Sequence, residues 1–569
     1  MPHSRREFLA LAGKASALAL VGAHLVDSPL AGTLVDGLRP LAALAAVPAS
    51  LPASAPLPLP GAEGLYGLLR PEAELTLAAR SVPGLLPATG AAMLAYEARQ
   101  GGRLWRNPIL VLQKGQEFRA RLVNNLAEPT IIHWHGVDAD WRQAGHPSYA
   151  VEPGGRYDYA FPITNRAGTY WYHPHPHGLT ARQSYLGLAS FFLVRDAEEE
   201  ALSRELDLTL GATDIPIVLQ DKRFDAHGGL VYAPSADDLL MGYMGTEVLA
   251  NGARRPTLRA STRLYRLRLL NGCTARIFNL AFVSTQGGKR PFLLIGNDGG
   301  LLETPQRLEQ LFLAPGERVE LLLDLRGLRP GEELALANAP FDPMHNEGAG
   351  HGAHGAAPAS APVSATATTG GGHSGHAPQS ASPQSAAPAL DEGAAYSILR
   401  ILVDRQERYD RTVPARLSTL PAASAPVTPG APRRFELALD RHANRWTIAG
   451  LVFDMDAAPV VVERRAPEAW EFIGATDGMP HPMHLHGYFF RVAARRGSPR
   501  QVLQRAVDAA GRLATDLGLK DTVLVWPGET VEVVPDFGTP NYPGEQTFLL
   551  HCHNLEHEDQ GMMLNVRVR

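Results

Sequence analysis

The segment QTFLLHCHNLEHEDQGMM, residues 546–563, joins a short β-type run to a group of potential metal ligands. Successive side chains of a strand point to opposite faces, so residues i and i+2 share a face. His551 and His553 are therefore expected on one face and Cys552 on the other. A strand of this kind can bind metal on both faces, so the segment predicts a β fold with two adjacent metal sites.

Short apolar runs bounded by Gly, Pro and Asn recur along the rest of the chain, among them TYWYH, RVELLLDL and TVLVWPGETVEVV. Their alternation and spacing are typical of β-sandwiches. A faint strand–turn–strand repeat occurs around KGQ at 114–116 and PGE at 315–317 and 527–529. The 55 Gly and 46 Pro also suit a loop-rich chain. We predict an all-β protein of three β-sandwich domains.

Composition shifts suggest where these domains end. We expect a leader at 1–45 and domains at 46–197, 198–424 and 425–569. Residues 345–393 are mostly Gly, Ala, Ser, Pro and His, a composition that cannot bury enough apolar area to order itself. The histidines of this insert either bind metal loosely or are incidental to a solvated linker. A Pro/Ala/Ser stretch at about 411–432 is the expected linker between domains.

The N-terminal residues are typical of a twin-arginine export signal. Arg5 and Arg6 precede a weakly apolar segment that Lys14 interrupts, so we expect no stable membrane span. The alternative is an ordinary cytosolic terminus. An export signal predicts a periplasmic or other extracytoplasmic location. The net charge is 53 − 58 = −5, which offers no basic field for nucleic acid.

Eleven of the 21 histidines lie in four short motifs, each with His at i and i+2: HWHG, HPHPHG, HPMHLHG and HCHNLEH. His177 is extra, and the other ten are the candidate ligands. A blue-copper electron-transfer centre uses two imidazoles, one thiolate and a weak thioether as ligands. The chain offers this set in His481, His557, Cys552 and Met562. Zinc would favour closed tetrahedral ligation, and an iron–sulfur cluster would need more cysteines. Eight histidines remain, and eight imidazoles in one pocket suit three copper ions.

These motifs resemble those of the multicopper oxidases, over nearly the whole chain after the leader, and bacterial laccases and copper-efflux oxidases are the most similar members. The resemblance implies three cupredoxin-like Greek-key domains and four copper ions: one type 1, one type 2 and two type 3. It implies four ligand sets: His133 and His484 for type 2; His135, His173 and His553 for one type 3 ion; His175, His486 and His551 for the other; and His481, Cys552, His557 and Met562 for type 1.

The resemblance also implies the activity. A laccase-like enzyme would couple one-electron oxidation of phenols or diamines, with Cu(I) as a further candidate, to four-electron reduction of O2 to water. We expect a monomer. The alternative is a copper-tolerance protein that acts mainly as a cuprous oxidase or as a copper-binding protein. A cupredoxin-fold structural protein would lack the ligands, and nitrite reductases lack the four His-x-His motifs.

Proton supply and the substrate side differ in part from the family pattern. Cys552 would carry electrons and Glu558 would deliver protons, but the place of a second family acid is taken by Ala144. Asp138 and Asp140 are the nearby candidates to replace it.

The substrate side gives two opposing signals. Only RHANR, residues 441–445, stands where copper-efflux oxidases carry a Met-rich insert, which predicts an uncovered type 1 site open to phenols. Asp477 and Met479 match an Asp-x-Met pair that contacts Cu(I) in copper-efflux oxidases, although Met479 could simply line the pocket. Five residues match no ligand position and are expected to be an inert buried thiol and ordinary polar groups: Cys273, His146, His177, His227 and His442.

Overall fold

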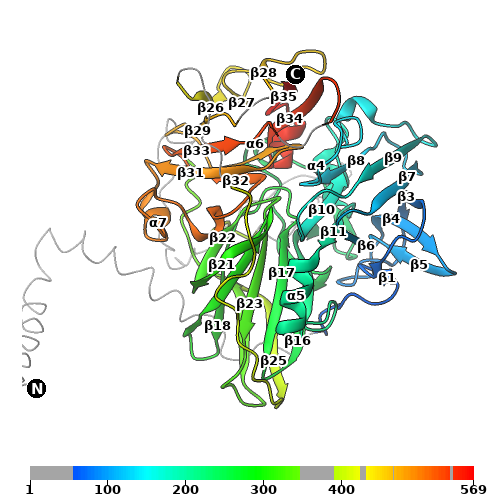
Figure 1. Ribbon diagram of the computed structural model, residues 1–569. Helices are drawn as coiled ribbons and strands as arrows, with labels where there is room; N and C mark the ends of the chain where they lie inside the picture. The colour runs from blue at the N-terminus through cyan, green and yellow to red at the C-terminus, as the bar shows by residue number, and fades with distance from the viewer. Residues whose placement is uncertain (1–54, 347–389, 423–430, 465–466, 539–541) are drawn as a thin grey trace, which may run out of the picture.

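A computed structural model describes residues 55–346, 390–422, 431–464, 467–538 and 542–569. Within these residues the strands form six sheets, arranged as three successive pairs (Figure 1). We call the pairs the N-terminal sandwich (64–195), the middle sandwich (214–405) and the C-terminal sandwich (433–568). The expected leader and residues 347–389 of the expected insert lie outside the described residues. No described helix is long and apolar enough to cross a bilayer.

The N-terminal sandwich contains the first eleven strands. They are β1 (Gly64–Leu65), β2 (Leu68–Leu69), β3 (Leu75–Val82), β4 (Met93–Gln100), β5 (Arg103–Arg106), β6 (Ile109–Gln113), β7 (Glu117–Asn124), β8 (Ile132–His135), β9 (Arg156–Pro162), β10 (Gly168–Pro174) and β11 (Ser190–Arg195). One sheet has the order β1-β5-β4-β3-β7-β9 and the other β2-β6-β11-β10-β8. Phe118 of the first sheet packs edge-on against Trp134 and Phe192 of the second, which fills the core between them.

The middle sandwich follows. Its strands are β12 (Asp214–Phe224), β13 (Leu230–Val231), β14 (Glu247–Ala250), β15 (Ala253–Arg254), β16 (Thr257–Ser261), β17 (Leu264–Asn271), β18 (Phe278–Ser284), β19 (Lys289–Arg290), β20 (Phe292–Asn297), β21 (Gly300–Leu308), β22 (Gln310–Leu313), β23 (Arg318–Asp324), β24 (Glu333–Asn338) and β25 (Tyr396–Arg405). The sheets run β15-β14-β12-β17-β23-β20-β21 and β16-β25-β24-β18-β19, with β13 beside β12 and β22 beside β18. Leu267 and Leu321 of one sheet share a core with Leu280 and Leu336 of the other.

The C-terminal sandwich holds the remaining strands. They are β26 (Arg433–Asp440), β27 (Arg445–Ile448), β28 (Val460–Val462), β29 (Trp470–Gly474), β30 (His481–Leu485), β31 (Phe490–Arg496), β32 (Thr522–Val525), β33 (Thr530–Pro535), β34 (Gln546–Cys552) and β35 (Met563–Val568). The sheets run β27-β26-β29-β33-β31 and β28-β35-β34-β30-β32. Trp470 and Val531 face Met483 and Leu550 across the core.

Short helices connect the strands. They are α4 (Thr180–Tyr185), α5 (Ala197–Glu205), α6 (Ala236–Met241), α7 (Arg500–Leu503), α8 (Leu555–Asp559) and the 3-10 turns η2 (Pro147–Tyr149) and η3 (Ala514–Asp516). Helix α6 begins at a capping box formed by Ser235 and Asp238 and ends at Gly242, which has a φ of 99°. Although α6 belongs to the middle part of the chain, it packs on α8 of the C-terminal part, where Gln560 Nε2 donates to Leu239 O at 2.6 Å.

The prediction of three β-sandwiches is confirmed. Parallel pairs such as β3 with β7 and β28 with β35 need crossover connections, so the sheets are not simple meanders. Figure 1 shows the N-terminal sandwich in blue and cyan beside the C-terminal sandwich in orange and red, with the green middle sandwich below both. The N-terminal and C-terminal sandwiches therefore meet along a seam, and that seam places the functional residues.

Candidate metal centres

Two pairs of neighbouring strands present histidines to the seam. In the antiparallel pair β8 and β10, His133 lies opposite His173. In the antiparallel pair β30 and β34, His484 lies opposite His551. Each pair continues its histidine row at i+2, with His135 on β8 and three residues just past the strand ends: His175, His486 and His553. The alternation expected from the sequence thus places eight imidazoles in one cluster.

The rings of this eight-histidine cluster interleave across the seam. His133 stacks on His486 and His135 stacks on His484, each with ring centroids 3.7 Å apart. The Nε2 atoms of His486 and His551 lie 3.0 Å apart. All eight side chains are at most 2 % exposed. Half of the cluster therefore comes from each sandwich, and neither sandwich alone can form it.

Hydrogen bonds at the outer edge of the cluster decide which nitrogens point inward. His133 Nδ1 is 2.6 Å from Ala144 O, and His484 Nδ1 is 2.8 Å from Asp521 O. Their Nε2 atoms face each other at 3.4 Å. Among the described residues, several buried ring nitrogens have no hydrogen-bond partner: His135 Nδ1, His173 Nε2 and both nitrogens of His175 and of His553. Each orphaned group would cost about 1–3 kcal/mol, so the donor set fits metal ions.

Burial also puts these rings in the protonation state that metals require. It lowers the pKa of His133 and of His553 to about 3. Burial likewise lowers five other pKa values well below the ordinary range of histidine: those of His135, His173, His175, His484 and His486. Neutral imidazoles at physiological pH are ready to act as ligands.

A second, smaller centre lies on the opposite face of β34. Cys552 Sγ is 3.6 Å from His481 Nδ1 and 3.7 Å from His557 Nδ1, and all three side chains are at most 1 % exposed. Metal–ligand bonds of about 2.0–2.3 Å at trigonal angles put ligand atoms about 3.6–3.8 Å apart, so the triad fits one ion. Met562 is fully buried in the same core, and its N–H donates to His557 O at 2.9 Å.

The Cys552 thiol differs from the imidazoles in its protonation. Burial raises the pKa of this thiol far above its usual range, with the Asn554 N–H at 3.4 Å opposing the rise. A metal ion must therefore displace a proton from Cys552 when it binds. Cys552 is covalently flanked by two members of the eight-histidine cluster, so the two centres are joined through a single residue.

Two buried acids contact the cluster. Glu558 lies with Oε2 3.1 Å from His551 Nδ1 and Oε1 3.4 Å from His175 Nε2, and so touches both halves of the cluster. Asp521 lies 3.1 Å from His135 Nε2 and is held by both terminal nitrogens of Arg318, at 2.8 and 2.6 Å. Sequence reasoning identified Glu558 but missed Asp521, because no motif marks it and its cation comes from the middle sandwich.

Helix α6 covers the outer side of the Cys552 centre. The Leu240 carbonyl accepts hydrogen bonds from His557 Nε2 and from Trp446 Nε1, both at 2.8 Å. Trp446 also packs edge-on against His481, with centroids 4.6 Å apart. The expectation of an uncovered site was wrong: the Met-rich insert is absent, but a helix from the middle part of the chain covers the site instead. The capping box could have predicted from the sequence that a helix begins here, but not that the helix packs over the Cys552 centre.

The structure separates the two residues expected to bind a cuprous substrate. Asp477 is 62 % exposed and pairs with Arg441 at 2.8 Å, and this pairing lowers the pKa of Asp477. Met479 is 4 % exposed and belongs to the C-terminal core. The carboxylate thus faces solvent while the thioether faces inward.

The residues expected outside the ligand sets contact other parts of the protein. Cys273 is buried and unpaired in the middle core, as predicted. His146 Nε2 is 2.9 Å from Asn565 Oδ1, and His177 packs on Phe453 with centroids 5.1 Å apart.

The fold and the two centres define a copper-binding protein built from cupredoxin-like sandwiches. Family descriptions named multicopper oxidase match residues 103–199 and 426–569. The crystal structure of the McoA multicopper oxidase from Aquifex aeolicus is 34 % identical, with a TM-score of 0.73, over 91 % of this chain and 100 % of that chain.

Two sequence relatives agree. "Multicopper oxidase mco" of Staphylococcus haemolyticus is 29 % identical over 81 % of each chain. A laccase of Haloferax volcanii is 32 % identical over 76 % of this chain and 66 % of its own. The chain belongs to the multicopper oxidase family, and it is an oxidoreductase with copper as its cofactor.

Proposed function

We propose that the protein is a laccase-like multicopper oxidase with four copper ions that couples one-electron oxidation of small reductants to four-electron reduction of O2 to water. The observation that carries the proposal is Cys552, which joins His481 and His557 in one centre while its two chain neighbours belong to the cluster. The ligands are the sets implied by the family resemblance: His133 and His484 (type 2); His135, His173 and His553, and His175, His486 and His551 (type 3); His481, Cys552, His557 and Met562 (type 1).

Copper bound at these ligands would supply the one-electron and O2 chemistry. The chain itself fixes the geometry. The Ala144 and Asp521 carbonyls orient His133 and His484, and the Leu240 carbonyl orients His557 with Nδ1 toward Cys552. Such outer hydrogen bonds fix the ring tautomers of metal ligands. Glu558, in contact with His175 and His551, is placed to hold a proton beside the cluster.

The substrate side favours small reductants. Every side chain of the Cys552 triad is buried, and α6 and Trp446 cover it, so a bulky phenol cannot contact a ligand ring directly. Phenols, diamines and Cu(I) are the candidate reductants, with Asp477 and Met479 as the residues for Cu(I). The closed site favours the second candidate, because a small ion such as Cu(I) needs less room than a phenol. This candidate is a copper-tolerance protein that acts mainly as a cuprous oxidase or as a copper-binding protein.

The decisive experiment is purification with copper, a visible spectrum, and O2 uptake with Cu(I) and with a phenol side by side. We expect a blue thiolate-to-copper band and O2 uptake. Cys552→Ser should abolish both, whereas Cys273→Ser, which alters the other buried thiol, should abolish neither. A colourless copper-loaded protein, or O2 uptake that survives Cys552→Ser, would refute the proposal. Copper binding without O2 uptake would favour the copper-binding alternative.

The cellular setting is a separate part of the proposal. Export by the twin-arginine route to the periplasm or another extracytoplasmic compartment is supported by Arg5 and Arg6, and a role in copper homeostasis would suit that location. We also propose a monomer, with domain limits near residues 197 and 424. Replacement of both arginines by lysine should keep the protein in the cytoplasm, as fractionation would show.

A further inference from the structure

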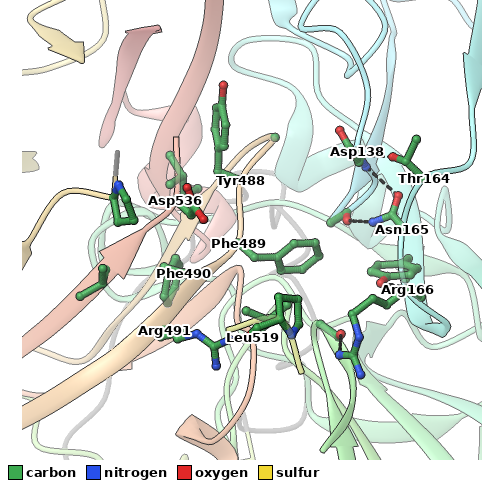
Figure 2. Close-up of a pocket in the computed structure, with 18 of the residues that line it drawn as sticks. Asp138, Thr164, Asn165, Arg166, Tyr488, Phe489, Phe490, Arg491, Leu519 and Asp536 are labelled. Atoms are coloured by element: carbon green, nitrogen blue, oxygen red, sulfur yellow. Dashed lines mark hydrogen bonds between the residues drawn. The ribbon is translucent and has the colours of Figure 1, made fainter. Parts of the chain in front are cut away.

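A cavity of about 200 Å³ lies behind the cluster, between the N-terminal and C-terminal sandwiches. Figure 2 shows Asp138, Thr164 and Asn165 on one side of it and Tyr488, Asp536 and Arg491 on the other, with Phe489 between them. This combination of acids, cations and aromatic rings is unlike a dry packing defect. Polar groups of this kind can hold water.

The cavity approaches the cluster through a thin wall. Its lining includes Gly136, which follows His135 directly, and Leu485 and Gly487, which flank His486. A Cβ at Gly136 would lie 2.5 Å from Asp521 Oδ2, which shows how closely the backbone here approaches that acid. Asp521 in turn lies 3.1 Å from His135 Nε2. One residue layer therefore separates the cavity from the His135 side of the cluster.

Asp138 is the acid at the wall of this cavity nearest in sequence to the cluster. Its Oδ2 accepts a hydrogen bond from Thr164 Oγ1 at 2.5 Å, and the Tyr542 hydroxyl also interacts with this carboxylate. Asn165 connects it to the wall: Asn165 Oδ1 accepts from Asp138 N, and Asn165 Nδ2 donates to Gly136 O, both at 2.9 Å (Figure 2). Burial raises the pKa of Asp138 above its usual value, although the Thr164 hydroxyl opposes the rise.

Neither Ala144 nor Asp140 can supply an acid at this cavity. Ala144 has no ionisable group and packs in the C-terminal core, where only its carbonyl contacts the cluster. Asp140 is occupied elsewhere, accepting hydrogen bonds from Gln546 Nε2 at 3.0 Å and from Arg142 N at 3.0 Å, and it does not line the cavity.

We propose that this cavity is the proton route to the His135 side of the cluster and that Asp138 is its proton-delivery residue. Asp138 would replace the acid that the family carries at the position of Ala144. The inference rests on the proposed O2 reduction, in which one O2 takes up four electrons and four protons to give two waters. The electrons come from the reductant by way of the Cys552 centre. Asp138 releases one proton at a time toward the cluster and regains it from water in the cavity, so it is not consumed.

The test compares Asp138→Asn with Asp140→Asn, two isosteric changes in the same loop. Asp138→Asn should slow O2 consumption about 10-fold, less than the about 10²–10⁴-fold of a sole proton donor because Glu558 serves the other side. It should also raise the solvent deuterium isotope effect. Copper content and the rate of anaerobic bleaching of the blue band should stay at wild-type values, because the reductive step needs no proton from Asp138. Asp138→Glu should restore most of the rate, and Asp140→Asn should change nothing.

Thr164→Val provides a second test that keeps every acid in place. Loss of the hydroxyl that holds Asp138 Oδ2 should slow O2 consumption by a smaller factor and raise the isotope effect in the same way. If Asp138→Asn fails to take up copper, Thr164→Val decides the question. Wild-type rates and isotope effects in the variants that load copper would overturn the proposal. A wild-type protein that consumes no O2 would instead overturn the proposed function.

Discussion

The Cys552 centre and the eight-histidine cluster lie on opposite faces of β34, yet they are assembled in different ways. The triad of the Cys552 centre comes from the C-terminal sandwich alone, with one outer contact from α6. The cluster takes four rings from each of two sandwiches, stacked across their seam. The first centre is thus a property of one folded unit, and the second a property of how two units dock. Changes at the seam should separate the two centres experimentally.

The largest expected effect comes from His486→Ala. His486 stacks on His133 across the seam and faces His551, so its loss opens the cluster from both sides. O2 consumption should fall at least about 10³-fold, the scale seen when one member of a catalytic unit is removed. The blue band and its anaerobic bleaching by a reductant should remain.

Absorbance, copper content and an oxygen electrode measure these properties on one sample. His177→Ala, at an exposed histidine of the HPHPHG motif, is the matched control and should behave as wild type. If the blue band disappeared together with O2 consumption in His486→Ala, the two centres would not be independent, and the comparison would fail.

A smaller loss is expected from Glu558→Gln. Glu558 is a buried carboxylate in contact with a ring from each half of the cluster, and the amide keeps its shape but cannot deliver a proton. O2 consumption should fall about 10²-fold. Bleaching of the blue band should be unaffected, because that step belongs to the other centre. Glu545→Gln, an exposed change before β34, serves as control, and full turnover in Glu558→Gln would remove Glu558 from the mechanism.

The contrast between the centres also explains what the sequence could reveal. His551, Cys552 and His553 were assigned to two faces because alternation along a strand is a local rule, and the four His-x-His motifs follow the same rule. Asp521 was missed because no motif marks it. Arg318 and the Leu240 carbonyl were missed because they reach the site from the middle part of the chain, and their positions depend on how the sandwiches dock, which no local pattern encodes. The same reason accounts for the mistaken expectation of an open Cys552 centre.

Gly242→Ala should loosen the cover on the Cys552 centre. Gly242 ends α6 with a φ of 99°, and a Cβ there would lie 2.2 Å from the Ala275 side chain and 2.7 Å from Asn554 Nδ2. The backbone strain costs about 1–3 kcal/mol, and the clash should push α6 away from His557. Oxidation of bulky phenols should rise several-fold while Cu(I) oxidation stays constant.

Steady-state kinetics with the two reductants and a denaturant melt test this prediction. Gly287→Ala is the matched control, because Gly287 has a φ of 82° but nothing within 4 Å of its added Cβ, so it carries the strain without the clash. Equal gains for phenols and Cu(I) in Gly242→Ala would mean that α6 does not select reductants by size.

The smallest effect is expected from Arg441→Ala. This variant tests whether Cu(I) binds as a substrate at Asp477, on the outer face of the Cys552 centre. Asp477 is bound to Arg441 at 2.8 Å in an exposed pair, and such pairs contribute at most about 1 kcal/mol, or about fivefold in affinity. Removal of the cation should therefore lower the KM for Cu(I) by a factor of about two to five and leave the KM for phenols unchanged. Arg441→Lys should keep the wild-type value, and Asp477→Asn should cancel the gain in the double variant. If the double variant kept the gain, the carboxylate would not be the group that competes for Cu(I), and Met479 would be left as a core residue with no part in substrate binding.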